Sequence, residues 1–346
     1  MAFTVLGLIL LGFILDALLG DFWGRWHPVC LIGKLIGFFE RLVQKIVGLT
    51  HGKIRPLIAA AKVDEKTGER YFAVLVKYLE LFLGGLLAVL VIGIVAYVSF
   101  LVANLHILIE LLMIHAAIAY KSLIDHLKAV MTPLKAGDTP RARQALAMIV
   151  GRDTEQLSQG EISRAGVETG AESMADGVIA PLFYGVIGGA PLMMAYKAVN
   201  TLDSMVGYPF PPYHNIGYIS AKLDDLLNIV PARLTALLLL TAGKLSNLNV
   251  SKGWQCLWAD AGKHPSPNAG RPEATLAGLL NVRLGGRNTY QGEVSFRAHL
   301  NAQGNFPEPA AVEHTIQMIK YTAWLGITVL LIFGFCLRWF MWLNFS

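Results

Sequence analysis

The stretch that decides the fold runs from Leu81 to Ala103 and reads LFLGGLLAVLVIGIVAYVSFLVA. Its 23 residues include no charged side chain, and a helix of this length crosses a hydrocarbon core of about 30 Å. A second apolar stretch, 322–342, closes with the sequence Arg338-Trp339-Phe340-Met341-Trp342. Basic and aromatic side chains at one end of an apolar run are typical of an anchor at the membrane surface. Both stretches are therefore predicted to be membrane-spanning helices.

The composition of the whole chain agrees with a membrane protein. Of its 346 residues, 54% are hydrophobic and 15% are charged, whereas soluble domains carry about 25% charged residues. The formal charge of +5, from 29 basic and 24 acidic residues, is too small to indicate a nucleic-acid-binding protein. It suits loops that face anionic lipid or anionic substrates. Cys30, Cys256 and Cys336 are far apart and odd in number, which predicts neither a disulfide framework nor a zinc site.

Four further segments are apolar but weaker as membrane spans, being short, interrupted or charged: 2–19, 105–119, 178–199 and 229–242. The first lacks a basic residue ahead of its apolar run, which argues against a cleaved signal peptide. The third contains three glycines and two prolines. Such backbone is stable at membrane depth only where it is buried in protein or lines a polar cavity.

The basic residues suggest an orientation in the membrane. Residues 20–80 hold ten Lys and Arg, residues 120–177 hold seven and residues 244–320 hold eight. Placing all three stretches in the cytoplasm requires an even number of crossings between them, which favours 105–119 as a returning helix. The expected fold is an all-α, polytopic helical membrane protein with four to six spans or re-entrant segments. It is a single integral-membrane domain over 1–346, with sizeable cytoplasmic polar segments at 120–177 and 244–320.

The first polar segment carries carboxylates at helical spacing. Successive members are seven, four and four residues apart: Glu161, Glu168, Glu172 and Asp176. On an α-helix these spacings bring the side chains to one face, where like charges repel. A cation opposite this face would relieve the repulsion, and Mg²⁺ with phosphate oxygens suits it because Mg²⁺ takes few carboxylates. The alternative is a solvated acidic face with Arg152 and Arg164 as counterions.

Polar residues also cluster after the interrupted apolar segment. Asn200-Thr201-Leu202-Asp203-Ser204 follows it directly, and the pair Asp224-Asp225 lies further along. Adjacent acids point about 100° apart on a helix, so the pair is interpreted either as a helix cap or as part of a metal site. Arg233, beside an apolar run, is a candidate for holding an anionic substrate.

The second polar segment contains a loop with two prolines, Lys263-His264-Pro265-Ser266-Pro267-Asn268-Ala269-Gly270. Prolines restrict the backbone, so the loop presents His264, Ser266 and Asn268 with little loss of entropy. Downstream, Arg283-Leu284-Gly285-Gly286-Arg287 offers two glycines for close backbone approach to a ligand and two guanidinium groups for phosphate or carboxylate. A surface turn is the alternative interpretation of this second motif.

Taken in order, these motifs resemble the adenosylcobinamide-phosphate synthase family, the membrane amide synthases of cobalamin biosynthesis. The resemblance covers essentially the whole chain. The motifs that carry it are Gly20-Asp21, His27-Pro28-Val29, Leu31-Ile32-Gly33, Val150–Thr154, Arg164 to Gly177, Ala180–Tyr184, Val199–Tyr208, Ala221–Asp225, Pro231–Leu234, His264–Gly270 and Arg283–Gly286. The stretch around residues 50–70 departs from the pattern and receives no role.

The resemblance implies an ATP-dependent amide ligation in the bacterial cytoplasmic (inner) membrane. A propionate carboxylate of adenosylcobyric acid would be joined to the amine of aminopropanol phosphate, or of aminopropanol. A carboxylate is a poor acyl donor, so the expected route passes through an acyl phosphate, with Mg²⁺ neutralising the phosphates. Expected partners are these substrates, membrane lipid and other membrane enzymes of late cobalamin synthesis, but no nucleic acid.

The roles of individual residues are hypotheses that accompany this resemblance. Metal ligands would be Glu168, Glu172 and Asp176. Nucleotide and substrate binding would use Arg152, Asp153, Arg164, Asn200, Asp224, Arg233, Ser266 and Asn268. Catalytic groups would be Glu168, Asp203, Asp225 and His264, since the substrate ammonium must lose a proton to a base.

Two rival interpretations belong to other classes. The interrupted helix at 178–199 and the apolar-segment acids Asp16 and Glu110 are features that a transporter for a corrinoid or another anionic solute would also show. A non-catalytic scaffold is the second rival, but it leaves the acidic helix and the arginine–glycine motif without a role.

Overall fold

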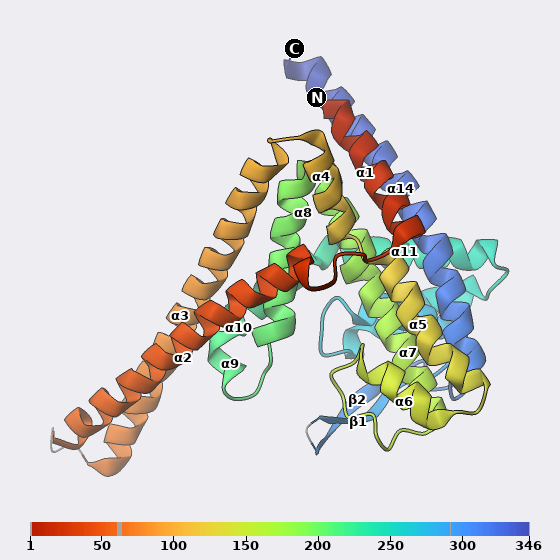
Figure 1. Ribbon diagram of the computed structural model, residues 1–346. Coiled ribbons are helices and arrows are strands. Elements are labelled where there is room, and N and C mark those ends of the chain that lie inside the picture. Colours follow the sequence, from red (N-terminus) through yellow and green to blue (C-terminus); the bar gives the residue numbers. More distant parts are fainter. Residues whose placement is uncertain (1, 61–63, 291, 346) are drawn as a thin grey trace. The chain divides into compact units, whose positions relative to one another are not determined.

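The computed structural model describes residues 2–60, 64–290 and 292–345, and it is dominated by helices (Figure 1). The helices up to the first polar segment are α1 (Ala2–Leu19), α2 (Pro28–Ala60), α3 (Glu65–Ala103), α4 (Ile107–Ala117), α5 (Tyr120–Lys135), α6 (Thr139–Ala147) and α7 (Gln159–Met174). Those that follow are α8 (Ala180–Val206), α9 (Tyr213–Ile216), α10 (Tyr218–Leu227), α11 (Ile229–Leu245), α12 (Val250–Ala259), α13 (Gly270–Leu279) and α14 (Pro309–Phe345). This architecture confirms the all-α fold class.

The apolar stretches of the sequence lie in helices long enough to cross a membrane. Four helical stretches qualify within the described residues: Lys66–Ala103, Ile107–Lys135, Gln159–Val206 and Pro309–Asn344. A fifth span results if α10 and α11, which meet at a bend of 46°, are counted as one broken span. The segment 2–19 forms α1, a shorter apolar helix. The chain is therefore a polytopic membrane protein, as its composition predicts.

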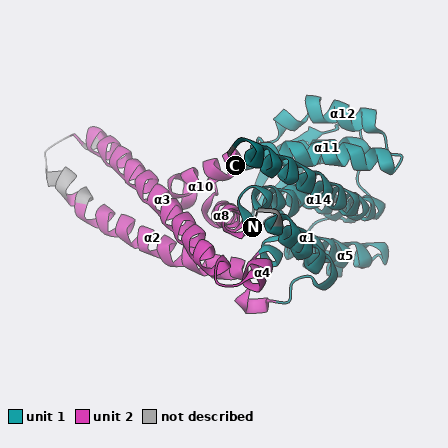
Figure 2. Ribbon diagram, turned by 90° about the horizontal axis from the view of Figure 1, so that it is seen from above, with its two compact units in different colours: residues 1–22, 114–189, 227–346 teal, residues 23–113, 190–226 magenta. Residues whose placement is uncertain are grey.

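The sequence predicts one domain over 1–346, and the structure divides the chain into two compact units (Figure 2). The first comprises residues 1–22, 114–189 and 227–346, and the second comprises 23–113 and 190–226. Each unit is assembled from segments that are far apart in the chain, and composition along the sequence cannot show such an assembly. The boundary inside α8 follows Gly188 and Gly189, whose backbone is not helical; Gly189 has φ 66° and ψ −162°. Only glycine adopts these angles readily.

In the first unit, α1 and α14 lie side by side, and the Phe13 and Trp324 rings meet edge to face at 5.0 Å (Figure 1). The helix α7 packs against α14 through small residues. A Cβ atom added to Gly170 would lie 2.7 Å from Cγ2 of Thr315, so this approach requires glycine. The core continues from α7 through α11 and α13 to Leu284 and Leu300.

In the second unit, α9 packs against α3 and reaches α2 through one hydrogen bond. Asn215 donates a hydrogen bond to Glu80 of α3 at 2.8 Å, and Tyr213 donates one to Glu40 of α2 at 3.3 Å. A Cβ atom on Gly84 would lie 2.0 Å from the carbonyl oxygen of Ile216. Gly84, the first of two adjacent glycines in the apolar stretch 81–103, thus allows α9 to pack directly against α3.

An antiparallel hairpin, β1 (Leu284–Tyr290) and β2 (Glu293–Leu300), interrupts the second polar segment. No hairpin is among the elements predicted from the sequence. In β2, Val294, Phe296 and Ala298 are apolar at every second position, and Gly292 follows the end of β1 with φ 82°. This alternation indicates a strand, but the run is too short to stand out in a polar segment. In the structure the three apolar side chains are exposed, so burial does not explain their pattern.

Candidate functional site

The site is built around α7, whose start is fixed by a capping box. Ser158 accepts from the backbone N–H of Glu161, and the Glu161 carboxylate accepts from the backbone N–H of Ser158 at 2.8 Å. Such reciprocal bonds satisfy two donors at a helix N-terminus. Glu161 therefore has a local structural role, although its spacing places it in the predicted acidic face.

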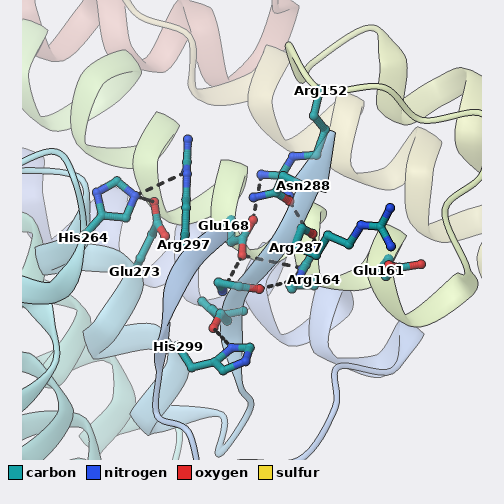
Figure 3. A network of polar contacts seen from close by, with 12 residues as sticks. Arg152, Glu161, Arg164, Glu168, His264, Glu273, Arg287, Asn288, Arg297 and His299 are labelled. Carbon is teal, nitrogen blue, oxygen red and sulfur yellow. Dashed lines mark hydrogen bonds and ion pairs between the residues drawn. The ribbon is translucent and has the colours of Figure 1, made fainter. Parts of the chain in front are cut away.

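Two helical turns beyond Glu161, Glu168 lies at the centre of a buried ion-pair network (Figure 3). Its Oε2 accepts from Nη2 of Arg152 at 2.7 Å, and its Oε1 accepts from the backbone N–H of Gly285 at 2.8 Å. Nε of Arg164 lies 3.8 Å from Oε1. Burial is the largest single effect and works to lower the pKa of Arg152, but the charge and hydrogen bond of Glu168, with the charges of Tyr290 and Glu273, together raise the pKa. Glu168 thus ties α7 to the loop before it and to the hairpin.

Arg164 extends the same network along β1. Its guanidinium donates to the carbonyl oxygens of Gly285 and Arg287, and to Oδ1 of Asn288 at 3.1 Å. Asn288 Oδ1 also accepts from Nη1 of Arg152 at 2.8 Å, so one amide oxygen bridges the two arginines. Nε of Arg164 and Nδ2 of Asn288 are buried and have no hydrogen-bond partner. Both donors are buried inside the network, and Nε of Arg164 is the one that faces Oε1 of Glu168.

The two glycines of the arginine–glycine motif allow this network to form. Gly285 and Gly286 have φ of 80° and 90°, and they lie at the bulge in β1. A Cβ atom on Gly286 would lie 2.9 Å from Nη1 of Arg164. The close approach predicted for this motif is made here by a protein side chain, within a strand and not in a surface turn.

Asp153 fastens the preceding loop to the same hairpin. Its backbone N–H donates to the carbonyl oxygen of Thr289, and its Oδ2 accepts from the backbone N–H of Gly292, each at 2.8 Å. The motif Val150–Thr154 is therefore brought to the hairpin by both backbone and side chain.

A second buried group combines the proline loop, α13 and β2 (Figure 3). Nε2 of His264 lies 3.5 Å from Oε1 of Glu273 and 3.3 Å from Nη1 of Arg297. Burial, together with the positive charge of Arg297, lowers the pKa of His264 to about 4, so this imidazole is neutral at pH 7. Burial and the charges of Glu168 and Glu172 raise the pKa of Glu273 well above its usual range. The carboxylates of α7 and the histidine loop therefore share one electrostatic environment.

The other polar groups of the proline loop are ordered by hydrogen bonds within it. Nδ1 of His264 accepts from the backbone N–H of Ser266 at 3.0 Å, and Oγ of Ser266 accepts from the N–H groups of Asn268 and Ala269. Oδ1 of Asn268 is 3.5 Å from Nη1 of Arg233 on α11. His264, Ser266, Asn268 and Arg233 are thus brought into one neighbourhood.

Glu172 and Asp176 continue the acidic series beyond Glu168. Glu172 is exposed on α7, and Asp176 is half-buried in a π-helical segment, Ala175–Ile179. Hydrogen bonds from i to i+5 turn Asp176 away from the direction that a continuous α-helix would give it. Within the described residues, no three His, Cys, Asp or Glu side chains are arranged to hold a metal ion.

The remaining predicted site residues belong to the second unit. Asn200 on α8 donates to Oδ1 of Asp224 on α10 at 3.2 Å, and Asp225 forms a 2.9 Å ion pair with Lys222. Asp203 accepts from Gly207 through its backbone carbonyl at 2.8 Å. Asp224 and Asp225 lie near the end of α10, so the helix-cap interpretation of this pair is wrong.

Three residues of the network escaped the sequence analysis: Glu273, Asn288 and Arg297. Asn288 and Arg297 carry a signal only if the hairpin is recognised, because β1 brings Asn288 to Arg152 and Arg164, and β2 brings Arg297 to His264. Glu273 follows the proline loop in the first turn of α13, where an acid is ordinarily explained by the helix dipole.

Comparisons with known proteins cover the same residues. A family model described as "CobD/Cbib protein" matches residues 9–319. A cobalamin biosynthesis protein CobD from Geobacter metallireducens is 40% identical over 94% of this chain and 92% of its own length. The protein of the same name from Clostridium perfringens is 38% identical over 94% of this chain and 96% of its own, and that from Photorhabdus laumondii is 45% identical over 81% and 82%. No solved structure matches the chain.

Proposed function

The chain belongs to the CobD/Cbib family, and on that premise we propose that it is an ATP-dependent amide ligase of cobalamin biosynthesis. It joins a propionate carboxylate of adenosylcobyric acid to the amine of aminopropanol phosphate, or of aminopropanol. The observation that carries the proposal is the family match, because it spans every residue of the network around Glu168 and of the histidine loop.

The proposed reaction has two steps. The carboxylate attacks the terminal phosphorus of ATP, forming an acyl phosphate and releasing ADP. The amine then attacks the acyl carbon, phosphate leaves, and the proton of the former ammonium passes to a base. Because negative charge accumulates on phosphate oxygens in the first step, fixed donors and positive charge near them accelerate it.

The arginine network supports a site for this chemistry. Arg152 and Arg164 are buried and bonded to the hairpin, so we assign them the positioning of that hairpin as well as the binding of phosphate. Nδ2 of Asn288 is a buried donor without a hydrogen-bond partner, which a phosphate oxygen would satisfy if the network opened to admit it. The exposed Arg287 and the half-buried Arg297 add positive charge beside them.

Mg²⁺ is part of the proposal, and the acidic side chains fit it in part. Both Glu168 oxygens are bonded to protein donors, so Glu168 is a poor direct ligand. The buried Oε1 of Glu273 has no hydrogen-bond partner, and its pKa is raised partly by Glu168 and Glu172, which indicates a surplus of negative charge. We assign Glu172 to Mg²⁺; Asp176 would join it only if the π-helical segment Ala175–Ile179 returned to the α-helical direction. When bound, Mg²⁺ supplies charge neutralisation at the phosphates.

Proton removal from the amine is assigned to the histidine loop of the first unit. His264 is neutral at pH 7, and its Nε2 lies 3.3 Å from Nη1 of Arg297 and 3.5 Å from Oε1 of Glu273, so the imidazole is the candidate proton acceptor of this group. In the second unit, Asp203, Asp225, Asn200 and Asp224 form a separate polar group, which is the alternative candidate for binding the amine.

The proposed location is the bacterial cytoplasmic membrane, with residues 120–177 and 244–320 in the cytoplasm. ATP is available on that side, and the positive residues of both segments favour it. A neighbouring membrane enzyme of the same pathway is a natural recipient of so large and scarce a product.

The test uses full-length protein in detergent with adenosylcobyric acid, aminopropanol phosphate and Mg²⁺-ATP, following corrinoid mass and ADP together. Amide product with stoichiometric ADP is the expected result. Neither product nor ADP, with an active reference enzyme present, would overturn the proposal and favour transport. Solute flux into sealed vesicles without ATP or amine would then identify the transporter suggested by the break at Gly188 and Gly189.

The metal assignment has its own test. Glu172→Gln removes charge with little change of shape, and we expect it to raise the Mg²⁺ concentration needed for half-maximal turnover at least tenfold. Glu155→Gln, an exposed acid in the preceding loop, is the matched control. Unchanged Mg²⁺ dependence in a folded Glu172→Gln protein would remove Glu172 from the metal site.

A further inference from the structure

The long helix α2 has two apolar faces. One is buried against its own unit by Ile32, Ile36, Val43 and Val47. The other, which we call the outer stripe, is exposed although its residues are large and apolar: Leu31, Phe38, Leu42, Ile46 and Leu49. Their spacings of seven, four, four and three residues place them in one line along the helix. An exposed apolar line of this length marks an interaction surface.

Basic side chains run along one edge of the outer stripe. Lys34, Arg41 and Lys45 are spaced seven and four residues apart and are all exposed. Glu40 is the one acidic residue in the sequence of α2, and it is held elsewhere, by hydrogen bonds from Tyr213 and Gln44. The charge beside the outer stripe is therefore positive along its whole length.

The same unit already meets lipid through α3. Its most apolar 18-residue window is only 33% buried within the protein, so most of that window is exposed and can meet hydrocarbon. α2 packs beside α3 in both views (Figures 1 and 2) but does not itself qualify as a span. A helix with an apolar stripe edged by Lys and Arg is the type that lies at the membrane interface, where long basic side chains reach the headgroups.

We propose that the outer stripe of α2 lies against the acyl-chain boundary of the membrane and that Lys34, Arg41 and Lys45 bind the phosphates of anionic lipids. The stripe spans about 27 Å, at 1.5 Å per residue, so it meets several lipids at once. Each basic residue near an anionic surface contributes a partition advantage of about fivefold. This surface lies outside the proposed reaction, and its test does not depend on catalysis.

The experiment places full-length protein in nanodiscs of phosphatidylcholine, with or without 50% phosphatidylglycerol. Amide hydrogen exchange over residues 28–50 is measured for the wild type, for K34Q/R41Q/K45Q, and for the control K128Q/K135Q/R141Q, which removes equal charge from α5 and α6. We expect exchange over 28–50 to be at least tenfold slower in the anionic discs for wild type and control, and the difference to vanish in K34Q/R41Q/K45Q. Equal exchange of the wild type in both lipids would overturn anionic-lipid binding.

A second measurement tests insertion of the stripe directly. A fluorescent label at Leu42→Cys, in a background with Cys30→Ser and Cys336→Ser, should be quenched by lipid bearing a shallow spin label and protected from aqueous iodide. Iodide quenching would overturn insertion. Protection from both quenchers, with a doubled particle mass, would also overturn it and assign the stripe to a second copy of the chain.

Discussion

Nη2 of Arg152 lies 2.7 Å from Oε2 of Glu168, and both side chains are almost completely buried. Arg164 approaches the other oxygen of the same carboxylate, so two guanidinium groups and the bulged strand β1 share one acid. Removing one member of a buried ion pair leaves an uncompensated charge, whereas the complete set gains little over apolar residues of equal size. The triad of Arg152, Arg164 and Glu168 therefore determines the position of the hairpin more than it adds to the net stability of the fold.

Replacing Glu168 should unfold the site. In Glu168→Gln two buried guanidinium groups lose their counterion, and we expect a loss of about 3–5 kcal/mol in the free energy of unfolding. Urea unfolding in detergent measures it, and hydrogen exchange should show β1 opening first. Glu155→Gln, which removes an exposed acid, should change stability by less than about 0.5 kcal/mol. Equal stability of the two variants would contradict the triad.

Gly286 should tolerate no side chain. Its φ of 90° is unfavourable for any other residue, and a Cβ atom would meet Nη1 of Arg164 at 2.9 Å. Gly286→Ala is expected to cost about 2–3 kcal/mol and to lower ligase turnover, because the arginine must move. Gly262→Ala, with open space around it, serves as the control. A Gly286→Ala protein with wild-type unfolding midpoint would show that the strand relaxes without strain.

The contact between α3 and α9 makes a separate prediction in the second unit. Gly84→Ala would place a methyl group 2.0 Å from the carbonyl oxygen of Ile216, whereas Gly93 on the same helix has nothing within 4 Å. We expect Gly84→Ala to lower the thermal midpoint by several degrees and Gly93→Ala to leave it unchanged or slightly raised. Identical midpoints in the same lipid would mean that α9 does not approach α3 this closely.

His264 makes the stability of the first unit depend on pH. Burial and Arg297 lower its pKa to about 4, while an unfolded histidine titrates near 6.5. Between these values the unfolded chain binds a proton that the folded chain does not, so stability falls as pH drops through this window, by up to about 3 kcal/mol. The free energy of unfolding of the wild type and His264→Gln at pH 7 and pH 5 measures this contribution.

Glu273 acts in the opposite sense on the same cluster. Its raised pKa gives a contribution that is present below the unfolded value near 4.5 and is lost as pH rises through the folded value. His264→Gln isolates the histidine contribution, since Glu273 is present in both proteins. An equal pH dependence in wild type and variant would show that folding does not lower the pKa of His264.

The sequence alone determined the class of this protein and the identity of most of its polar site. The uncharged run Leu81–Ala103 admits a single stable outcome in lipid, since its backbone groups must be hydrogen-bonded within the segment. The motifs around Arg152, Glu168 and His264 were equally visible, because each is a short local pattern of charged residues and glycines.

Only the tertiary structure decided what those residues contact. The spacing of Glu161, Glu168, Glu172 and Asp176 predicts one acidic face, but a cap holds the first, arginines hold the second and a π-helical turn rotates the last. The bridge through Asn288 depends on a hairpin more than 100 residues away in the chain. Local periodicity fixes the face of a helix, whereas partners are chosen by packing between distant segments, and no sequence window contains that information.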